Sequence, residues 1–226
     1  STGQVYKTEA YLKHKDGHLV HVSIRIAPMY SPKGNIVGVT QIFTDNKEHF
    51  QISKEDVKKY EDLFFDSVTK LPNKNYTDMI LNSRFGEFKR YNWPFGVFFF
   101  QIDNYDKMKS IYGEKVREDI LKKVTKIISD NFRPFDTLGK WSEKEFVVII
   151  VNVDEERMVM LGERLVKLVE KTSLPVGKGN INLTISLGGT IVTLIDSVEI
   201  LINRLKELTE RSILKGGNCI TTQLTT

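Results

Sequence analysis

The spacing of hydrophobic positions changes along the chain. Up to residue 45 it is strand-like, in three runs separated by turn-forming residues: 9–13, 19–28 and 36–45. Asp16-Gly17 lies between the first two runs, and this pair tolerates the positive φ of a tight hairpin turn. The N-terminal part therefore predicts a small antiparallel sheet.

Residues 47–66 have helical spacing instead. Ser53 is placed to cap a first turn, because its hydroxyl can accept a hydrogen bond from an unpaired amide. Val57, Tyr60 and Phe64 follow at intervals of three and four, which puts them on one stripe. We expect a connecting helix that either packs on its own domain or pairs in a parallel dimer. With fewer than about three heptads, the pattern leaves both arrangements open.

Beyond residue 66, helical and strand-like spacings alternate. The order is helix, strand, helix, helix, two strands, helix, strand, helix, strand. Residues 95–102 are a nearly continuous apolar run, typical of a strand covered on both faces. Residues 181–187 alternate as a single strand. This order predicts an α+β fold, with a mixed sheet flanked by helices in a ferredoxin-like arrangement.

Composition narrows the class of protein. The 226 residues are 40% hydrophobic and 27% charged, with a net charge of +4, as expected of a globular domain. Lysines are scattered among acidic residues, so nucleic-acid binding is not expected. A single Cys219 excludes an internal disulfide, and no apolar run approaches a membrane span. We expect a cytoplasmic location. The chain opens on strand-like sequence, which indicates a longer parent protein and leaves an upstream membrane anchor open.

Three groups of residues have simple structural explanations. His14, His18 and His21 straddle a hairpin turn, which places them on different faces and disfavours metal binding. Residues 177–179, Gly-Lys-Gly, lack the rest of a phosphate-binding loop and read as a turn between helix and strand. Residues 98–100 are three phenylalanines and are expected in the core.

Two segments resemble the GGDEF family, the diguanylate cyclases. Residues 66–74 are similar to the signature Asp-x-Leu-Thr-Gly-Leu-x-Asn-Arg that opens these domains. Residues 142–146 read Ser-Glu-Lys-Glu-Phe where the family has Gly-Gly-Asp-Glu-Phe. The resemblance covers residues 66 to about 222 and implies the nucleotide-cyclase-type GGDEF fold. The first three strands resemble the C-terminal half of a PAS sensor domain. We therefore expect a partial PAS domain (1–46), a connecting signalling helix (47–66) and a degenerate GGDEF domain (67–226).

The resemblance implies that a working cyclase joins two GTP molecules with the help of metal ions. Gln101 and Lys144 stand where the family has its two metal-binding carboxylates. A neutral amide and an ammonium group are poor ligands for a hard divalent cation. Ser142 and Glu143 replace the glycines that let phosphates approach, and only Glu145 of the acidic pair remains. We expect no metal, no cofactor and no catalysis.

The substrate contacts implied by the resemblance are also changed. Lys109 occupies the place of a guanine-reading Asn, and Glu118 conservatively replaces its partner Asp. Near the C-terminus, Ile213 and Gly217 stand where the family has a Lys and an Arg on phosphate, while Lys215 lies two residues away. These changes converge on the same active site, so we interpret the domain as a pseudoenzyme.

One family feature is retained. Arg133 and Asp136 match the Arg-x-x-Asp of the family's inhibitory site, and Asp136 lies six residues before Ser142, the first position of the turn motif. Arg164 falls at the position of a second arginine of that site. The resemblance implies that these three residues bind cyclic di-GMP. A guanidinium suits bidentate contacts, and a carboxylate can accept from guanine N–H groups. In the structural alternative, Arg133 caps a helix and Asp136 fixes a turn.

Three functions follow from these residues. In the first, the chain is an inactive cyclic di-GMP receptor in a signalling protein. It receives a signal from the PAS-like part through the connecting helix, and a homodimer through that helix is possible. Its downstream partner is an unidentified protein. In the second, it is a ligand-free pseudoenzyme used for dimerisation or partner docking. In the third, Lys144 and Glu145 support GTP binding or slow GTP hydrolysis.

Overall fold

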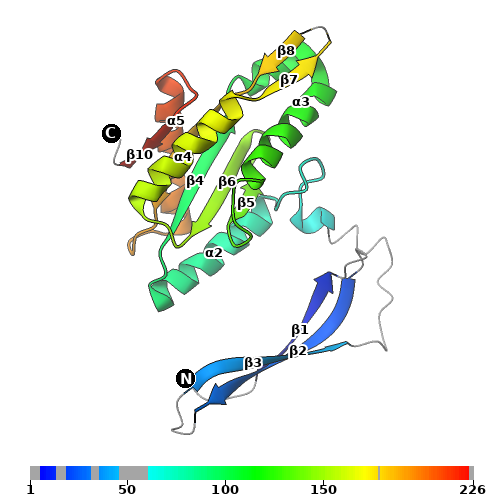
Figure 1. Ribbon diagram of the computed structural model, residues 1–226, viewed down its shortest axis with the longest axis vertical. Coiled ribbons are helices and arrows are strands. Elements are labelled where there is room, and N and C mark those ends of the chain that lie inside the picture. The colour runs from blue at the N-terminus through cyan, green and yellow to red at the C-terminus, as the bar shows by residue number, and fades with distance from the viewer. Residues whose placement is uncertain (1–5, 14–18, 32–35, 46–60, 178, 224–226) are drawn as a thin grey trace. The chain divides into compact units, whose positions relative to one another are not determined.

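The computed structural model describes residues 6–13, 19–31, 36–45, 61–177 and 179–223. The chain divides into two compact units, Ser1–Asp62 and Leu63–Thr226. The first unit contains a three-stranded antiparallel sheet with β2 in the centre (Figure 1). Its strands are β1 (Tyr6–Lys13), β2 (Leu19–Tyr30) and β3 (Ile36–Asp45). The predicted N-terminal antiparallel sheet is confirmed, and its assignment to a PAS domain stays a prediction.

Several expectations lie outside the described residues. These are the Asp16-Gly17 turn, His14 and His18, and most of the predicted connecting helix, including Ser53. The end of that helix is described, and residues 61–64 are helical. The domain boundaries predicted at residues 46 and 66 therefore stay predictions.

The second unit is built on a five-stranded mixed sheet with the order β10–β9–β4–β6–β5. Strand β10 runs parallel to β9, and the other neighbours are antiparallel. The predicted α+β fold with a helix-flanked mixed sheet is confirmed. The strands of this unit are β4 (Phe95–Ile102), β5 (Thr137–Lys140), β6 (Glu145–Val151), β7 (Ser173–Val176), β8 (Gly179–Asn182), β9 (Ile185–Ile191) and β10 (Ile220–Thr222).

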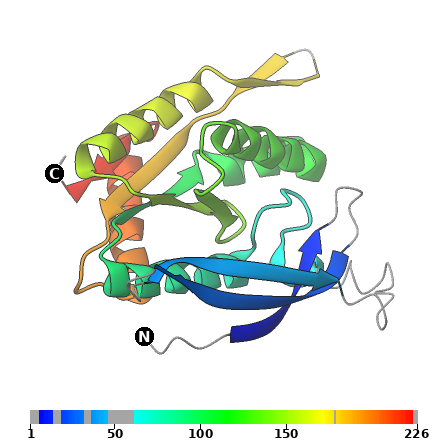
Figure 2. The same cartoon turned by 60° about the horizontal axis from the view of Figure 1, so that its bottom comes forward.

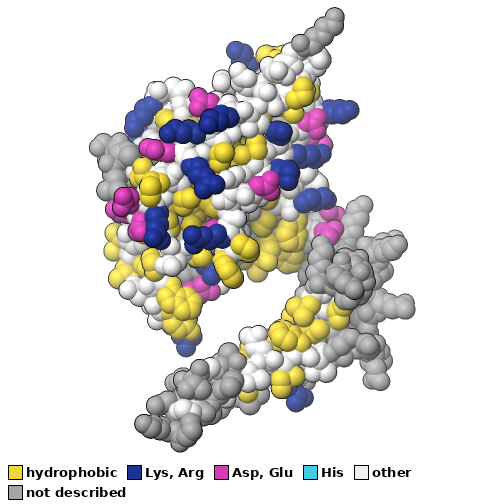
Figure 3. All heavy atoms as spheres, in the orientation of Figure 1, with side chains coloured by type: hydrophobic (Ala, Val, Ile, Leu, Met, Phe, Trp, Pro, Cys, Tyr) yellow, Lys and Arg dark blue, Asp and Glu magenta, His cyan; other side chains and the backbone are white. Residues whose placement is uncertain are grey.

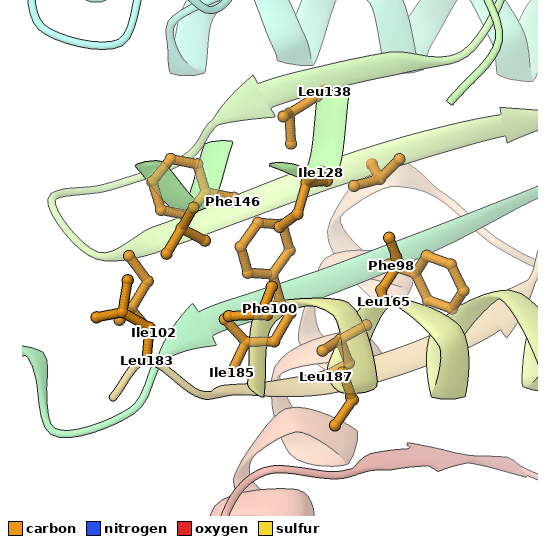
Figure 4. Close-up of a cluster of buried hydrophobic side chains, with 14 of the residues drawn as sticks. Phe98, Phe100, Ile102, Ile128, Leu138, Phe146, Leu165, Leu183, Ile185 and Leu187 are labelled. Carbon is orange, nitrogen blue, oxygen red and sulfur yellow. The ribbon is translucent and has the colours of Figure 1, made fainter. Parts of the chain in front are cut away.

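Helices cover both faces of this sheet, α3 and α4 on one and α2 and α5 on the other (Figures 1 and 2). Strand β4 supplies both cores by alternation. Phe98 and Phe100 point towards α3 and α4, as Figure 4 shows, whereas Phe99 joins the cluster with α2 and α5. All three rings are buried, as predicted. The helices are α2 (Lys74–Tyr91), α3 (Tyr105–Ser129), α4 (Glu155–Glu170) and α5 (Val198–Leu214).

Local signals position these helices. Asn73, Asp154 and Ser197 are the N-caps of α2, α4 and α5, and each side chain accepts from an amide of the first turn. Helix α5 lies very close to β9, because a Cβ on Gly188 would come within 2.4 Å of the Leu205 carbonyl oxygen. Glycine at this position therefore sets the spacing between helix and sheet.

Two predicted elements differ from the structure. The single strand expected over residues 181–187 is divided between β8, which pairs only with β7, and β9 in the main sheet. The alternation misleads because Ile181, Leu183 and Ile185 all bury into the same core although the hydrogen-bond partner changes. Residues 177–179 consequently join two strands rather than a helix and a strand. The two helices expected before β5 are confirmed, because α3 is interrupted at Gly113, whose φ of +79° and ψ of −177° are not helical.

No described helix is long and apolar enough to cross a membrane. On the face formed by α3 and α4, Lys and Arg side chains are mixed with acidic and hydrophobic ones, as Figure 3 shows. The view contains no continuous basic stripe, in agreement with the charge distribution of the sequence.

Candidate functional site

The first candidate site is the turn that joins β5 to β6. The amides of Trp141 and Ser142 both donate to the carbonyl oxygen of Glu145, at 2.8 and 3.2 Å, which closes the turn. The Trp141 ring packs edge-on against Phe99, with centroids 6.4 Å apart. The backbone of the turn is thus anchored to the core, and the side chains of Glu143 and Lys144 project from it beside α3.

Both charged side chains of the turn are paired with the first turns of α3. Lys144 Nζ lies 2.6 Å from Asp106 Oδ2, and Glu143 Oε1 lies 2.6 Å from Lys109 Nζ. The two pairs have opposite polarity, since the turn supplies the cation in one and the anion in the other. Together they hold the turn to the helix with side chains of the same chain.

Arg117 extends this cluster across the kink of α3. Its guanidinium donates to the Tyr105 hydroxyl at 3.2 Å and to Glu143 at 3.4 Å, and it pairs with Glu114. Only 12% of the Arg117 side chain is exposed, so the guanidinium fills the space between helix and turn. Sequence reasoning missed Arg117, because two of its partners, Tyr105 and Glu143, stand 12 and 26 residues away.

The electrostatics of the cluster follow from these contacts. The hydrogen bond from Lys109 lowers the pKa of Glu143, and the same bond raises the pKa of Lys109. Burial raises the pKa of the Tyr105 hydroxyl and outweighs the bond from Arg117. Both shifts favour the charged forms of Glu143 and Lys109, so each is the counterion of the other.

The residues at the turn do not fit a divalent cation. Gln101 faces Glu145 across β4 and β6, so one carboxylate stands beside an amide. Asp103 is the nearest acid along the chain, but its two oxygens accept from the Ser186 hydroxyl at 2.6 Å and the Asn218 amide at 3.0 Å. Within the part of the chain that is described, no group of three or more His, Cys, Asp and Glu is arranged to hold a metal ion.

The residues of the loop after α5 also do not suit phosphate binding. Gly217 has a φ of +78°, and a Cβ there would lie 3.1 Å from an oxygen of Asp103. A larger residue at this position would be strained and would collide with that carboxylate. Ile213 is half-buried and apolar, while Lys215 is the exposed C-cap of α5. The loop packs on Asp103 through Gly217 and the Asn218 amide.

The start of the hairpin is tied to the segment before α2. Lys140 Nζ lies 2.7 Å from Asp66 Oδ2, with only 13% and 17% of the two side chains exposed. Asp66 also accepts from the amide and hydroxyl of Thr69, both at 2.8 Å. Burial acts to raise the pKa of Asp66, but the bonds from Lys140 and Thr69 lower it overall. The sequence motifs at residues 66–74 and 142–146 were recognised, but the ion pair between Asp66 and Lys140 was not predicted.

The second candidate site is the turn at residues 133–136, at the other end of the same hairpin. The Asp136 amide donates to the Arg133 carbonyl at 3.0 Å. One carboxylate oxygen of Asp136 accepts from the Arg133 amide, and the other from the Val151 amide, each at 3.1 Å. Asp136 therefore fixes the turn and ties it to the end of β6.

Helix α4 adds its arginine beside this turn. Arg164 donates to the Asn131 side-chain oxygen at 2.8 Å, and Asn131 precedes Arg133 by two residues. The side chains of Arg133 and Arg164 are both exposed. The structure thus gathers the three predicted residues into one region. Asn131 was missed by sequence reasoning, since nothing in its spacing marks it as the partner of a residue 33 positions away.

Known proteins identify the second unit. The family described as "Diguanylate cyclase, GGDEF domain" matches residues 63–219, more than half of the chain. The chain belongs to the GGDEF family. Two relatives are the diguanylate cyclase DosC of Escherichia coli K12, 28% identical over 68% of this chain and 32% of that protein, and diguanylate cyclase A of Treponema denticola, 26% identical over 83% and 49%. The chain spans about a third to a half of their lengths.

Solved structures agree on the fold. The GGDEF domain of DgcB from Caulobacter crescentus, in complex with c-di-GMP, superposes with a TM-score of 0.68 at 17% identity, over 70% of this chain and 95% of that one. The FimX GGDEF domain from Pseudomonas aeruginosa gives 0.67 at 17% identity, over 71% and 99%. At these identities the likeness concerns the fold alone, and it confirms the expected GGDEF fold of the second unit.

Proposed function

We propose that this GGDEF domain is catalytically inactive and serves as a cyclic di-GMP receptor through Arg133, Asp136 and Arg164. The observation that carries the proposal is a contrast within one hairpin. At the turn of residues 142–145 the charged side chains pair with opposite charges in the same chain, whereas at the other end the Arg133 side chain is exposed and the exposed Arg164 donates to the neutral side chain of Asn131.

Inactivity is supported by the chemistry of the turn. A cyclase needs metal ions that neutralise phosphate charge and activate the attacking hydroxyl. The ammonium of Lys144 stands at one metal position and pairs with Asp106, and Gln101 stands at the other. Glu143 adds a negative charge where phosphate would approach. Each change opposes the binding of a magnesium-bound triphosphate.

Binding of cyclic di-GMP is supported by the second turn. Two guanidinium groups on α4 and the 133–136 turn provide forked donors for phosphate or guanine. Asp136 accepts two amide bonds, and an ionised carboxylate has about four acceptor sites, so it can still accept from guanine N–H groups. The DgcB domain was solved with this dinucleotide, which makes it a reasonable ligand to test here.

A ligand-free docking domain is the second candidate. It is favoured by the structural use of Asp136 as the fastener of the turn and by the bond from Arg164 to Asn131. In either case the domain would receive its signal from the PAS-like part through the connecting helix, with dimerisation through that helix. The solved complex of the diguanylate cyclase SiaD with its activator SiaC gives a precedent for a protein partner in this fold.

Isothermal titration separates these functions. We expect cyclic di-GMP to bind, and Arg133→Ala to weaken binding about 10- to 100-fold through the loss of charged hydrogen bonds. The matched control is Arg157→Ala, an exposed arginine at the other end of α4 that pairs with Asp154. Absence of cyclic di-GMP binding leaves the docking role. GTP with magnesium should neither bind nor turn over, and measurable turnover would contradict inactivity.

A further inference from the structure

A cavity adjoins the 133–136 turn. Its volume is about 440 Å³, and it lies between α2, the start of β4 and the end of β6. Small-molecule sites commonly measure about 300–1,000 Å³, so the space is adequate for a ligand group. Its walls include Phe135 from the turn and Trp93 from the segment before β4.

The cavity shares a wall with the proposed cyclic di-GMP site. Phe135 lies between Arg133 and Asp136 in the chain, and it faces the cavity. Val151 also lines the cavity, and its amide donates to Asp136. The turn that carries Arg133 and Asp136 therefore also forms part of the cavity wall.

The apolar walls are suited to a flat ring. Phe135 and Trp93 are 72% and 61% exposed, whereas the phenylalanines of β4 are buried. Nucleobases commonly stack on exposed aromatic rings that lie beside a charged site. The Trp93 ring is further held by Tyr91, with centroids 5.0 Å apart.

The polar edge of the cavity matches one base. Arg84 NH1 donates to Glu87 Oε2 at 2.7 Å, and about a third of each side chain is exposed. A carboxylate accepts from the N1 and N2 hydrogens of guanine, and a guanidinium donates to its O6 and N7. Adenine presents an amino group in place of O6 and carries no hydrogen on N1. The pair therefore complements guanine and opposes adenine.

We propose that this cavity is a guanine subsite, which stacks one base of cyclic di-GMP against Trp93 and Phe135 and reads its edge with Glu87 and Arg84. The subsite rests on the proposed receptor function, because Arg133 and Arg164 would hold the rest of the same ligand. It adds base selectivity to a site whose arginines alone recognise only charge and shape.

Tryptophan fluorescence reports on the cavity directly, since Trp93 and Trp141 are the two tryptophans of the chain. In Trp141→Phe, only Trp93 emits, and cyclic di-GMP should quench it on stacking. In Trp93→Phe, the emission of Trp141 should not change. Thermal unfolding of both variants checks that they are folded. A signal from Trp93 that does not respond to bound ligand would overturn the subsite.

Base reading is tested by Glu87→Gln, which should weaken cyclic di-GMP at least about tenfold. Wild-type protein should prefer cyclic di-GMP to cyclic di-AMP, and Glu87→Gln should reduce that preference. Glu207→Gln, an exposed carboxylate on α5, is the matched control. If cyclic di-GMP binds and Arg133→Ala abolishes it while Glu87→Gln has no effect, the subsite is wrong and the receptor function stands. If wild-type protein binds no cyclic di-GMP, both are wrong.

Discussion

The β5–β6 hairpin has two ends, and they differ in how their charges are used. At the end formed by residues 142–145, Glu143 and Lys144 are each 2.6 Å from a partner on α3. At the end formed by residues 133–136, the side chain of Arg133 is exposed and a 440 Å³ cavity opens beside it. The charged side chains of the first end are paired within the chain, and the second end is the one that we propose binds a ligand.

The difference shows that the two ends are chemically independent although they share strands. Phe146 and Val148 lie between the two ends and are buried in the core. Charged groups at one end can therefore change without altering the backbone of the other.

The largest effect should come from damage to the core that both ends share. Phe100 is fully buried and stacks on Phe146 at 5.0 Å. Phe100→Ala should cost about 3–5 kcal/mol, because it removes a buried ring and leaves a cavity. Urea unfolding measures this cost. A loss below about 1 kcal/mol would mean that the hairpin is held by its ends instead of its core.

The next effect concerns the ion pair between Lys140 and Asp66, which ties the start of the 142–145 turn to the segment before α2. Lys140→Met should cost about 2–3 kcal/mol, since it leaves Asp66 largely buried without its counterion. Lys126→Met is the control, and its exposed pair with Asp130 should contribute less than about 0.5 kcal/mol. Equal losses in the two variants would show that burial of the Asp66 pair has no special role.

Much of this architecture could be predicted from sequence, and the reasons are local. A nearly continuous apolar run predicted β4, because this strand is covered on both faces. Caps such as Asn73 and Ser197 stand where helices begin. The resemblance of residues 66–74 and 142–146 to GGDEF motifs gave the family, which the comparisons confirm.

The rest depended on contacts between distant residues. Asp106 and Lys144 are 38 positions apart, and their pairing follows from where α3 crosses the turn. The cavity beside Phe135 arises from three separate elements. The β7–β8 hairpin was missed because its strands are only four residues long and continue the apolar alternation into β9. No single-sequence pattern encodes these relations.

A smaller effect on stability should distinguish a structural role from a ligand-binding role at residues 133–136. Asp136→Ala removes the acceptor of two backbone amides and should cost about 1–2 kcal/mol. Arg133→Ala should change stability by less than about 0.5 kcal/mol, because its side chain is exposed. Thermal unfolding without ligand compares the two. If Arg133→Ala is the more destabilising, its guanidinium has a structural role and the receptor proposal is weakened.

The smallest effect on stability should be seen at residues 142–145. Glu143→Gln should lower the thermal midpoint by no more than about 2 °C at neutral pH, because Glu143 is half-exposed and its pairs are screened. The pKa of Glu143 is lowered from 4.5 in the folded protein, so its contribution is complete above that value and is lost as pH falls through the lowered pKa.

The gap in stability between wild type and Glu143→Gln should therefore persist at pH values above 4.5 and close as the pH falls through the lowered pKa of Glu143. High salt should narrow the same gap at neutral pH. A gap that widens on acidification would contradict the assignment of Glu143 as the ionised partner of Lys109.

Backbone amide chemical shifts, recorded during titration with cyclic di-GMP, test the contrast between the two ends most directly. We expect shifts at residues 131–136, at Arg164 and around Glu87 and Trp93, while the amides of residues 142–145 stay unchanged. GTP with magnesium should move neither group. Shifts centred on residues 142–145 with either nucleotide, or none at residues 131–136 with cyclic di-GMP, would contradict an inactive domain that binds cyclic di-GMP at residues 133–136.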